Sequence, residues 1–254
     1  MQSDDTTWQD PAVVLNSGAP SPFLLLGDHA GRVIPPVLEN LGLSEPDLSR
    51  HIAWDIGVFA LGQHLSRMLD ATFISQRFSR LVIDCNRHPD RADAIPEVSD
   101  QSAIPGNRGL SAEDRATRIA QVLTPYHDRI AMELEARATR CTPTTVVALH
   151  SFTPVMQGFV RPWRFGVLHL GGSPFSESML ARLRAEIDPL QVGDNEPYKM
   201  DGVDFTIPHH AIGRGLDYVE LEVRQDLLAD EAGQIAIAEQ LARLLPAALQ
   251  DCPR

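Results

Sequence analysis

The chain has 254 residues, which is enough for one large domain or two small ones. Hydrophobic residues make up 43% and charged residues 22%, an ordinary globular composition that excludes collagen-like, coiled-coil and disordered classes. The formal net charge of −12, without a basic stripe, argues against nucleic acid or an anionic membrane surface as a partner. Lys199 is the only lysine, so anion recognition would depend mainly on arginine guanidinium groups.

The number and spacing of the cysteines and the N-terminal segment indicate the cellular compartment of the protein. Cys85, Cys141 and Cys252 are an odd number without C-x-x-C spacing, which argues against a disulfide framework and favours a reducing environment. The segment MQSDDTTWQD has neither the positive charge nor the apolar run of a signal peptide. Apolar runs such as Phe23–Leu26 are far shorter than the ~20 residues needed to cross a bilayer. We therefore expect a cytoplasmic protein.

Short β-rich apolar runs alternate with longer segments of helical periodicity along the chain. Ser111 and Asp114 have the spacing of a capping box, which marks the clearest helix start. The alternation predicts an α/β fold with a mixed, largely parallel central sheet between helical layers. In chain order, we predict strands at 12–15 and 23–26, a helix at 54–69, strands at 71–75 and 81–84, a helix from 111 to about 134, strands at 144–149 and 165–169, a helix at 176–187, a strand at 218–223 and a helix at 231–249.

The segment 89–109 has no periodicity and is rich in proline, aspartate, alanine and glycine. At this length it is more typical of a lid or binding loop than of a domain linker. Since the chain contains no convincing boundary, we predict one domain over residues 1–254.

Candidate functional residues follow the predicted strands, because ligands of such sheets bind at the carboxyl ends of the strands. Two of these positions are histidines, each at the end of an apolar run. Another is a segment bracketed by arginines, and a fourth carries alternating carboxylates. The candidates are Asp28 and His29, then Arg80, Asp84, Asn86 and Arg87, then His150, and finally Glu220 and Glu222.

Each candidate also has a purely structural interpretation. A single histidine at a strand end is usually a hydrogen-bonded core residue, and Asn86-Arg87 can simply close a strand. Alternation places Glu220, Glu222 and Arg224 on one face, which is also the pattern of a half-exposed edge strand. Considered together, however, two imidazoles and a carboxylate suit a divalent metal ion of the kind found in zinc hydrolases. A further carboxylate could accept a proton, and arginines could hold an oxyanion and a substrate carboxylate.

These residues resemble a known family. The Asp84-x-Asn86-Arg87 element, with Arg80 before it and with His29 and His150, resembles the zinc carboxypeptidase and aspartoacylase clan. From about residue 20 to residue 230 the chain resembles the N-formylglutamate amidohydrolase family more closely. The similar segments are SRLVIDCNR (79–87), PGNRGLS (105–111), TPYH (124–127), ALHSFTP (148–154), VGDNEPY (192–198) and LEVRQDL (221–227).

The resemblance implies a phosphorylase/hydrolase-like fold with zinc, or another divalent ion, at the carboxyl edge of the sheet. His29 and His150 match the two zinc histidines of the clan. The carboxylate ligand of the clan normally follows three residues after the first histidine, where this chain has Arg32, which cannot coordinate a metal. We favour Asp55, at the start of the predicted helix, as the third ligand and keep Asp28 as the alternative.

The resemblance also assigns roles to other side chains. Glu222 matches the general base, with Glu220 as the alternative, and Arg80 matches the arginine that polarises the scissile carbonyl. Arg87, helped by Asn86, would hold the carboxylate of the substrate. His127 is either a buried core histidine or a substrate contact, and His210 is either a loop histidine or part of the pocket wall.

The implied function is a metal-dependent amidohydrolase acting on a small N-acyl amino acid, with N-formyl-L-glutamate as the family substrate and glutamate and formate as products. Two alternatives remain open. One is a deacylase for a different acyl group or amino acid, and the other is a metal-free carboxylate-binding or sensor protein. The sequence predicts no oligomeric state.

Overall fold

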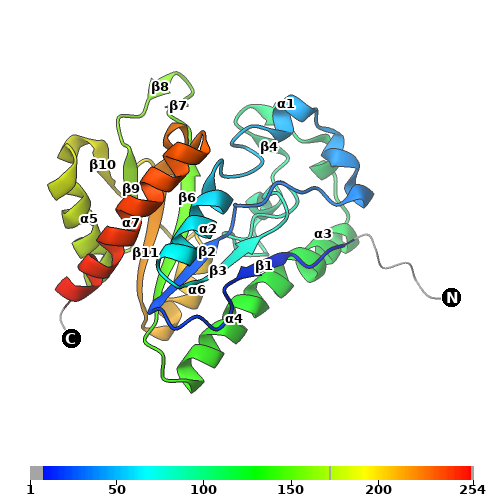
Figure 1. Ribbon diagram of the computed structural model, residues 1–254. Helices are drawn as coiled ribbons and strands as arrows, with labels where there is room; N and C mark the ends of the chain where they lie inside the picture. Colours follow the sequence, from blue (N-terminus) through cyan, green and yellow to red (C-terminus); the bar gives the residue numbers. More distant parts are fainter. Residues whose placement is uncertain (1–7, 172, 253–254) are drawn as a thin grey trace.

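The computed structural model describes residues 8–171 and 173–252, and a seven-stranded mixed sheet forms its centre (Figure 1). Neighbouring strands are parallel from β3 through β2 and β6 to β11, whereas β1 is antiparallel to β3 and β9 is antiparallel to β11. The predicted mixed, largely parallel sheet is therefore confirmed. Its order is β1 (Ala12–Leu15), β3 (Thr72–Gln76), β2 (Phe23–Gly27), β6 (Thr145–Phe152), β11 (Asp217–Arg224), β9 (Phe165–Leu168) and β10 (Val192–Asp194).

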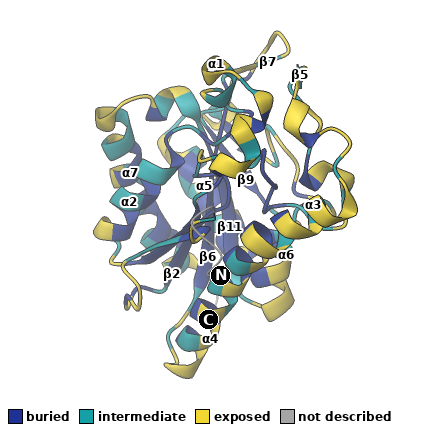
Figure 2. Ribbon diagram, turned by 90° about the vertical axis from the view of Figure 1, so that its right-hand side faces the viewer, coloured by how far each residue is buried: buried dark blue, intermediate teal, exposed yellow. Residues whose placement is uncertain are grey.

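Helices cover both faces of this sheet, which produces three layers. On one face α2 (Val58–Met68), α5 (Pro174–Glu186) and α7 (Glu231–Asp251) pack on alternate strand residues such as Leu25 and Val147. The intervening residues, such as Leu24 and Val146, face a second core. This core includes residues of α4 (Thr124–Thr139), of α6 (Thr206–His210) and of the π-helical turn Ile119–Leu123. Burial on both faces explains why these strands are almost continuously apolar (Figure 2).

Most predicted helices are present with shifted ends. The capping box of Ser111 and Asp114 is confirmed and begins α3 (Ala112–Arg118), which continues through the π-helical turn into α4. The helix predicted from residue 54 begins only at Val58, after Gly57 with φ of 83°. A Cβ at Gly57 would lie 2.4 Å from the Cβ of Leu228, so only glycine allows this turn to pack closely.

The strand predicted at residues 81–84 is wrong, because this segment forms buried turns. Leu81 packs into a separate small core with Leu41 and Ile104, while Val82 and Ile83 pack into the core around α4. The carbonyls of Leu81 and Val82 accept hydrogen bonds from the side chains of Asn107 and Arg118. These side-chain donors satisfy the buried backbone carbonyls, so the segment needs no neighbouring strand. The apolar pattern alone had assigned it to a sheet.

The remaining elements are short. Residues 89–109 contain two small hairpin strands, β4 (Val98–Ser99) and β5 (Ser102–Ala103), and two 3-10 turns. A second hairpin, β7 (Val155–Met156) and β8 (Phe159–Val160), follows β6, and α1 (Glu45–Leu48) precedes α2. Within the described ranges, the structure contains no helix of the length and hydropathy required to cross a membrane.

Candidate metal centre and active-site cavity

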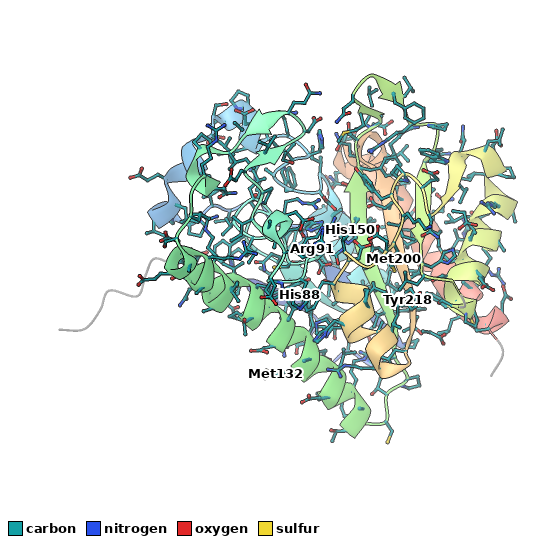
Figure 3. All side chains as sticks on the ribbon, turned by 180° about the vertical axis from the view of Figure 1, so that it is seen from behind. His88, Arg91, Met132, His150, Met200 and Tyr218 are labelled. Carbon is teal, nitrogen blue, oxygen red and sulfur yellow. The ribbon has the colours of Figure 1, made fainter. Side chains whose placement is uncertain are left out.

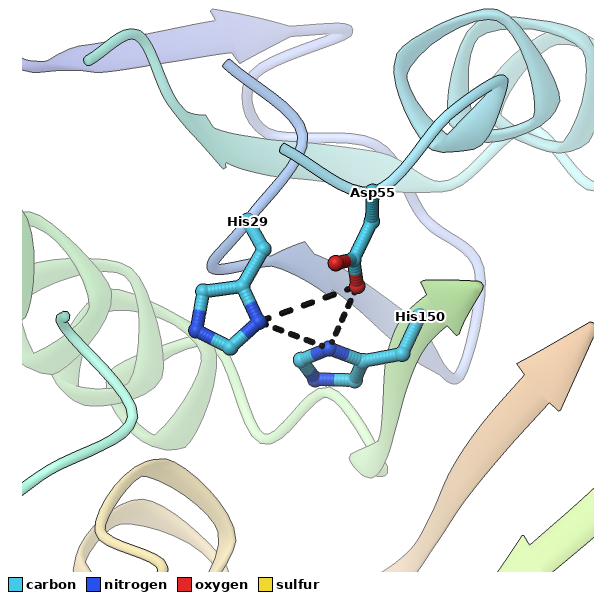
Figure 4. A group of neighbouring side chains, drawn as sticks. All are labelled: His29, Asp55 and His150. Carbon is cyan, nitrogen blue, oxygen red and sulfur yellow. Dashed lines mark hydrogen bonds and ion pairs between the residues drawn. The ribbon is translucent and has the colours of Figure 1, made fainter. Parts of the chain in front are cut away.

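Three side chains from distant parts of the chain meet at the carboxyl edge of the sheet (Figure 4). His29 follows β2, Asp55 lies in the turn before α2, and His150 lies near the end of β6. The two Nδ1 atoms of the histidines are 3.2 Å apart, and Asp55 Oδ2 lies 3.0 Å from His150 Nδ1 and 3.7 Å from His29 Nδ1. The backbone N–H of Asp55 donates to the carbonyl of His29 at 2.8 Å, which joins the two loops.

The spacing and chemistry of these atoms suit a metal ion. A tetrahedral ion with ligand bonds of about 2.0–2.2 Å holds its donors roughly 3.3–3.6 Å apart, close to the three separations observed. His29 Nε2 lies 2.7 Å from Asp84 Oδ1, so the neutral imidazole carries its hydrogen there and leaves Nδ1 free as a donor to a metal. This buried His-Asp-His group could therefore bind a metal ion.

Asp28 occupies a different position from Asp55. It is buried and accepts a hydrogen bond from the hydroxyl of Tyr126 at 2.7 Å. Its second oxygen lies 3.8 Å from His150 Nε2, on the side of the imidazole opposite to the one that faces Asp55. Of the two carboxylates, the geometry thus brings only Asp55 beside the Nδ1 atoms of both histidines.

Negative charge accumulates around the two imidazoles. Burial lowers the pKa of His150, but the hydrogen bond to Asp55 and the charges of Glu220 and Glu222 outweigh it and raise this pKa well above its usual value. Burial and Arg80 lower the pKa of His29, yet Asp84 and Asp55 raise it overall. Five buried carboxylates, those of Asp28, Asp55, Asp84, Glu220 and Glu222, thus accompany a single arginine, Arg80, at the centre of the site. This excess of acids favours a bound cation.

Glu220 and Glu222 are carried by β11, which lies inside the sheet between β6 and β9. The edge-strand interpretation is therefore wrong, and both carboxylates are buried against the cavity rather than solvated. Glu222 lies opposite His150 in the ladder between β11 and β6. Burial, reinforced by Asp55 and Glu220, raises the pKa of Glu222 to about 8, and burial raises that of Glu220 to about 7.

The predicted arginines reach the same place. Arg80 Nη2 donates to Asp84 Oδ2 at 2.6 Å, and Arg80 Nη1 lies 3.5 Å from Asp55 Oδ1. Asp84 therefore bridges His29 and Arg80, a role that the sequence interpretation did not assign to it. The signal was its position in the Asp84-x-Asn86-Arg87 element.

Asn86 and Arg87 both line the cavity and also hold the segment that follows residue 203. Asn86 Oδ1 accepts hydrogen bonds from the backbone N–H groups of Phe205 and Thr206 at 3.0 and 2.9 Å. Arg87 Nη1 donates to Asp204 Oδ1 at 2.8 Å. The acidic partner of Arg87 is thus Asp204, a cavity residue that no sequence pattern had singled out.

His127 and His210 lie together, outside the lining of the cavity that contains His29, Asp55 and His150. His127 Nδ1 is 2.9 Å from His210 Nε2, and His127 Nε2 is 2.9 Å from the carbonyl oxygen of Cys85. Both imidazoles are buried, and His210 lies on the short helix α6. Among the described residues that line the cavity, neither histidine is present.

A cavity of about 510 Å³ opens beside these groups. Seen from behind, His150 lies in the middle of the molecule, between the segment containing Arg91 and the one containing Met200 (Figure 3). The walls of the cavity come from His51, from the loop 93–100, from the residues after β6 and from the segment 198–204. This volume is sufficient for a small polar molecule and has charged groups of both signs around it.

The fold and this site define an α/β protein with a candidate metal centre at the carboxyl edge of its central sheet. The chain belongs to the N-formylglutamate amidohydrolase family, because the sequence model of that family matches residues 21–229. A gene product of Agrobacterium tumefaciens of known crystal structure is 41% identical, with a TM-score of 0.91 over 95% of this chain and 96% of that one.

The same fold is found in a more distant member of the family. The N-formylglutamate amidohydrolase of Ralstonia eutropha JMP134 is 19% identical, with a TM-score of 0.64 over 96% of this chain and 98% of that one. At this identity the likeness concerns the fold alone. No curated protein sequence matches the chain.

Proposed function

We propose that the protein is a metal-dependent hydrolase that cleaves the amide bond of an N-acyl amino acid, with N-formyl-L-glutamate as the first candidate substrate. The observation that carries this proposal is the convergence of His29, Asp55 and His150 on one point of the cavity, with Glu222 beside them. Family membership supports the amide as the bond that is cleaved. The products would be the free amino acid and formate, or another short acid.

His29, Asp55 and His150 would hold the metal ion, and zinc is the proposed ion because two imidazoles and one carboxylate are a common zinc ligand set. A bound divalent ion supplies Lewis-acid chemistry, making water a stronger acid near neutral pH and polarising a carbonyl oxygen. Arg32, at the position where the clan normally has its carboxylate ligand, is exposed and stacks over Trp54. Asp55 would replace that ligand from a different loop.

Glu222 would accept a proton from the attacking water and then deliver it to the nitrogen of the departing amine. Its pKa of about 8 suits both steps, since a group that titrates near the working pH both takes up and releases protons readily. Arg80 would donate to the oxygen that becomes negatively charged as the acyl carbon turns tetrahedral. Asp84 holds that guanidinium in place and keeps it charged.

Arg87 would hold a carboxylate of the substrate, with Asn86 beside it. Arg87 is half-buried and its Nη1 already donates to Asp204, but a guanidinium has five donors and can bind a second acceptor.

The three cysteines of the described residues, Cys85, Cys141 and Cys252, are free, which supports a reducing compartment such as the cytoplasm.

The decisive experiment combines metal analysis with a substrate screen. The purified chain is assayed against N-formyl, N-acetyl and N-succinyl amino acids with Zn²⁺, Co²⁺ or Mn²⁺. We expect about one tightly bound metal ion per chain and metal-dependent release of the amino acid. Hydrolysis of acetyl or succinyl compounds alone would change the acyl group but keep the mechanism. Absence of both metal and turnover under metal-replete conditions would favour a carboxylate-binding protein instead.

A further inference from the structure

The two imidazoles of the candidate metal centre are oriented in the same way. Each directs its Nδ1 atom toward Asp55 Oδ2, which lies 3.0 Å from His150 and 3.7 Å from His29 (Figure 4). The other ring nitrogen, Nε2, lies beside a different buried carboxylate in each case. That of His29 is 2.7 Å from Asp84 Oδ1, and that of His150 is 3.8 Å from Asp28 Oδ2. The site therefore contains two carboxylate–histidine units that point at one place.

Asp28 and His150 each have one buried atom that lacks a hydrogen-bond partner. Among the described residues, neither Asp28 Oδ2 nor His150 Nε2 has a partner at hydrogen-bond distance, and both residues are no more than 3% exposed. Leaving either atom unpaired costs free energy. Within residues 8–171 and 173–252, no other carboxylate lies at ion-pair distance from this nitrogen. The two atoms are therefore the natural partners of each other.

The Nε2 atom of His150 must carry the ring hydrogen if Nδ1 is to bind a metal. A neutral imidazole has one hydrogen, and the nitrogen that coordinates an ion must be free of it. Metal-binding histidines commonly donate the other N–H to a carboxylate, which fixes the orientation of the ring and makes the bound nitrogen more basic. Asp28 Oδ2 would have to come only about 0.8 Å closer to form such a hydrogen bond.

Tyr126 holds the other oxygen of Asp28. Its hydroxyl donates to Asp28 Oδ1 at 2.7 Å, and the tyrosine is fully buried. Burial, reinforced by the charge of Asp28, raises the pKa of this phenol well above its usual value, so the hydroxyl remains a donor. Tyr126 lies in the first turn of α4, directly after the π-helical turn Ile119–Leu123, an irregularity that is frequent at functional sites. The TPYH segment (124–127) thus reaches the candidate metal centre through Asp28.

We propose that Tyr126 and Asp28 are positioning residues of the metal site, which hold His150 so that its Nδ1 atom faces the ion. This inference rests on the proposed function, in which His150 is a metal ligand. Tyr126 orients the Asp28 carboxylate, and Asp28 Oδ2 accepts the hydrogen of His150 Nε2. Neither of the two is among the described residues that line the cavity, so neither touches the substrate. Asp28 would thus serve His150 as Asp84 serves His29.

The central test removes the phenolic hydroxyl without changing any charge. The affinity of Tyr126→Phe for Zn²⁺ is measured by competition with a chelator. We expect it to fall about 3- to 10-fold, less than the roughly 10- to 100-fold that is usual when a direct partner of a metal-binding histidine is lost. Asp28→Asn should reach that larger range, because an amide offers one acceptor oxygen, whereas Tyr126 and His150 both need one.

Tyr218→Phe is the matched control. Tyr218 is also buried, and its hydroxyl accepts a hydrogen bond from the backbone N–H of Leu170 at 3.2 Å. It lies opposite Val146, near the start of the strand pair whose other end holds His150 and Glu222. This variant should bind Zn²⁺ as the wild type does. Excess Zn²⁺ should restore the kcat of Tyr126→Phe, which it would not do for a general folding defect.

Two results of these measurements would overturn the assignment. One is wild-type affinity for Zn²⁺ in both Tyr126→Phe and Asp28→Asn, which would show that neither side chain acts on His150. The other is an equal loss of affinity in Tyr126→Phe and Tyr218→Phe, which would reduce the effect to the loss of any buried hydroxyl. Asp28→Asn nearly preserves the shape of the side chain, so it carries the test even if Tyr126→Phe is poorly folded.

A measurement on the metal-free chain separates this inference from the proposed function. In isotopically labelled protein, the Nε2–H of His150 should give a slowly exchanging proton resonance that its carboxylate acceptor shifts downfield. The resonance should be lost or move upfield in Asp28→Asn, and it should move in Tyr126→Phe but not in Tyr218→Phe. An unchanged resonance in Asp28→Asn would overturn the assignment, even if the wild type binds metal. A wild type that shows this pattern but binds no metal would support the contact and count against the hydrolase.

Discussion

Two pairs of buried histidines in this molecule have similar separations between their rings but opposite surroundings. The rings of His29 and His150 are 4.9 Å apart between centroids, and those of His127 and His210 are 5.2 Å apart. Facing nitrogens lie at hydrogen-bond distance in both pairs, at 3.2 and 2.9 Å. The first pair is surrounded by carboxylates, whereas the second contacts a backbone carbonyl and the ring of Phe205.

The surroundings determine the protonation of each pair. Carboxylates raise the pKa of His29 and of His150 despite their burial, so this pair attracts positive charge. Burial lowers the pKa of His127 to about 4 and that of His210 further still, so this pair stays neutral. His127 donates to the Cys85 carbonyl through Nε2 and accepts from His210 through Nδ1, so both nitrogens of His127 are satisfied without any ion, whereas His210 Nδ1 has no hydrogen-bond partner among the described residues. Nearby acids, rather than the imidazoles themselves, distinguish a candidate metal centre from a structural pair.

The largest effect is expected from removing one imidazole of the first pair. His150→Ala should lose the bound metal and about 10⁴-fold in kcat/KM, because a catalytic metal ion contributes several kcal/mol to transition-state stabilisation. His210→Ala, in the second pair, should keep its metal. Metal content by elemental analysis and steady-state kinetics measure the two outcomes. Metal loss in His210→Ala, or full metal content in His150→Ala, would remove the distinction between the pairs.

The carboxylates around the first pair differ in their expected roles. Glu222→Gln should lower kcat by about 10³-fold while the metal stays bound, because the amide cannot accept the proton of the attacking water. Glu220→Gln, two residues away on the same strand, should cost much less. Kinetics and metal content of the two variants decide between them. A reversed order of effects would identify Glu220 as the base.

The neutral pair predicts a specific dependence of stability on pH. An unfolded histidine binds a proton below about pH 6.5, whereas folded His127 does so only below about pH 4. Between these values the unfolded chain holds the additional proton, so stability is complete above about pH 6.5 and falls as the pH decreases toward 4. The expected loss due to His127 is about 3 kcal/mol.

A variant isolates that contribution from the other titrating groups. His127→Gln can still donate to the Cys85 carbonyl but does not titrate, so its unfolding free energy should fall less between pH 7 and pH 4.5. Urea unfolding of both chains at several pH values measures the difference. If the unfolding free energies of His127→Gln and of the wild type fall equally as the pH decreases, the folded structure does not lower the pKa of His127.

Much of the architecture follows from the sequence because it depends on local patterns. Apolar runs such as Phe23–Leu26 identified the central strands, and the carboxyl ends of parallel strands necessarily meet at one edge. The two histidines at such ends, His29 and His150, are therefore expected to lie together on the pattern alone. The predicted partner Asp55 also lies there, since its backbone N–H donates to the carbonyl of His29 and ties the turn before α2 to that edge.

Other features depend on distant partners and have no local signal. The strand predicted at 81–84 failed because side chains from Asn107 and Arg118 satisfy its carbonyls. Glu220 and Glu222 had the pattern of a solvated edge strand, since carboxylates are seldom fully buried unless they are paired or functional. Arg161 follows an exposed hairpin, and only the folded chain stacks it between Phe152 and Tyr198.

Asp84 provides the smallest and most specific test of the first pair. Its carboxylate accepts from His29 Nε2 and from Arg80, so it orients one proposed metal ligand and the proposed oxyanion-binding group together. Asp84→Asn has nearly the same shape and can still accept from His29, but it lacks the negative charge. Metal affinity should fall by about 10- to 100-fold, the usual cost of losing an outer partner of a metal-binding histidine.

Competition with a chelator measures this affinity. Asp251→Asn is the matched control, because Asp251 also binds an arginine, Arg182, but at the exposed end of α7. That variant should bind metal as the wild type does. Unchanged affinity in Asp84→Asn would mean that the position of the His29 ring alone, and not the charge behind it, prepares this histidine for a metal. The carboxylates would then affect metal affinity only through the total charge of the site. Asp28→Asn, which removes a carboxylate that does not contact His29, should in that case change the metal affinity as little as Asp84→Asn does.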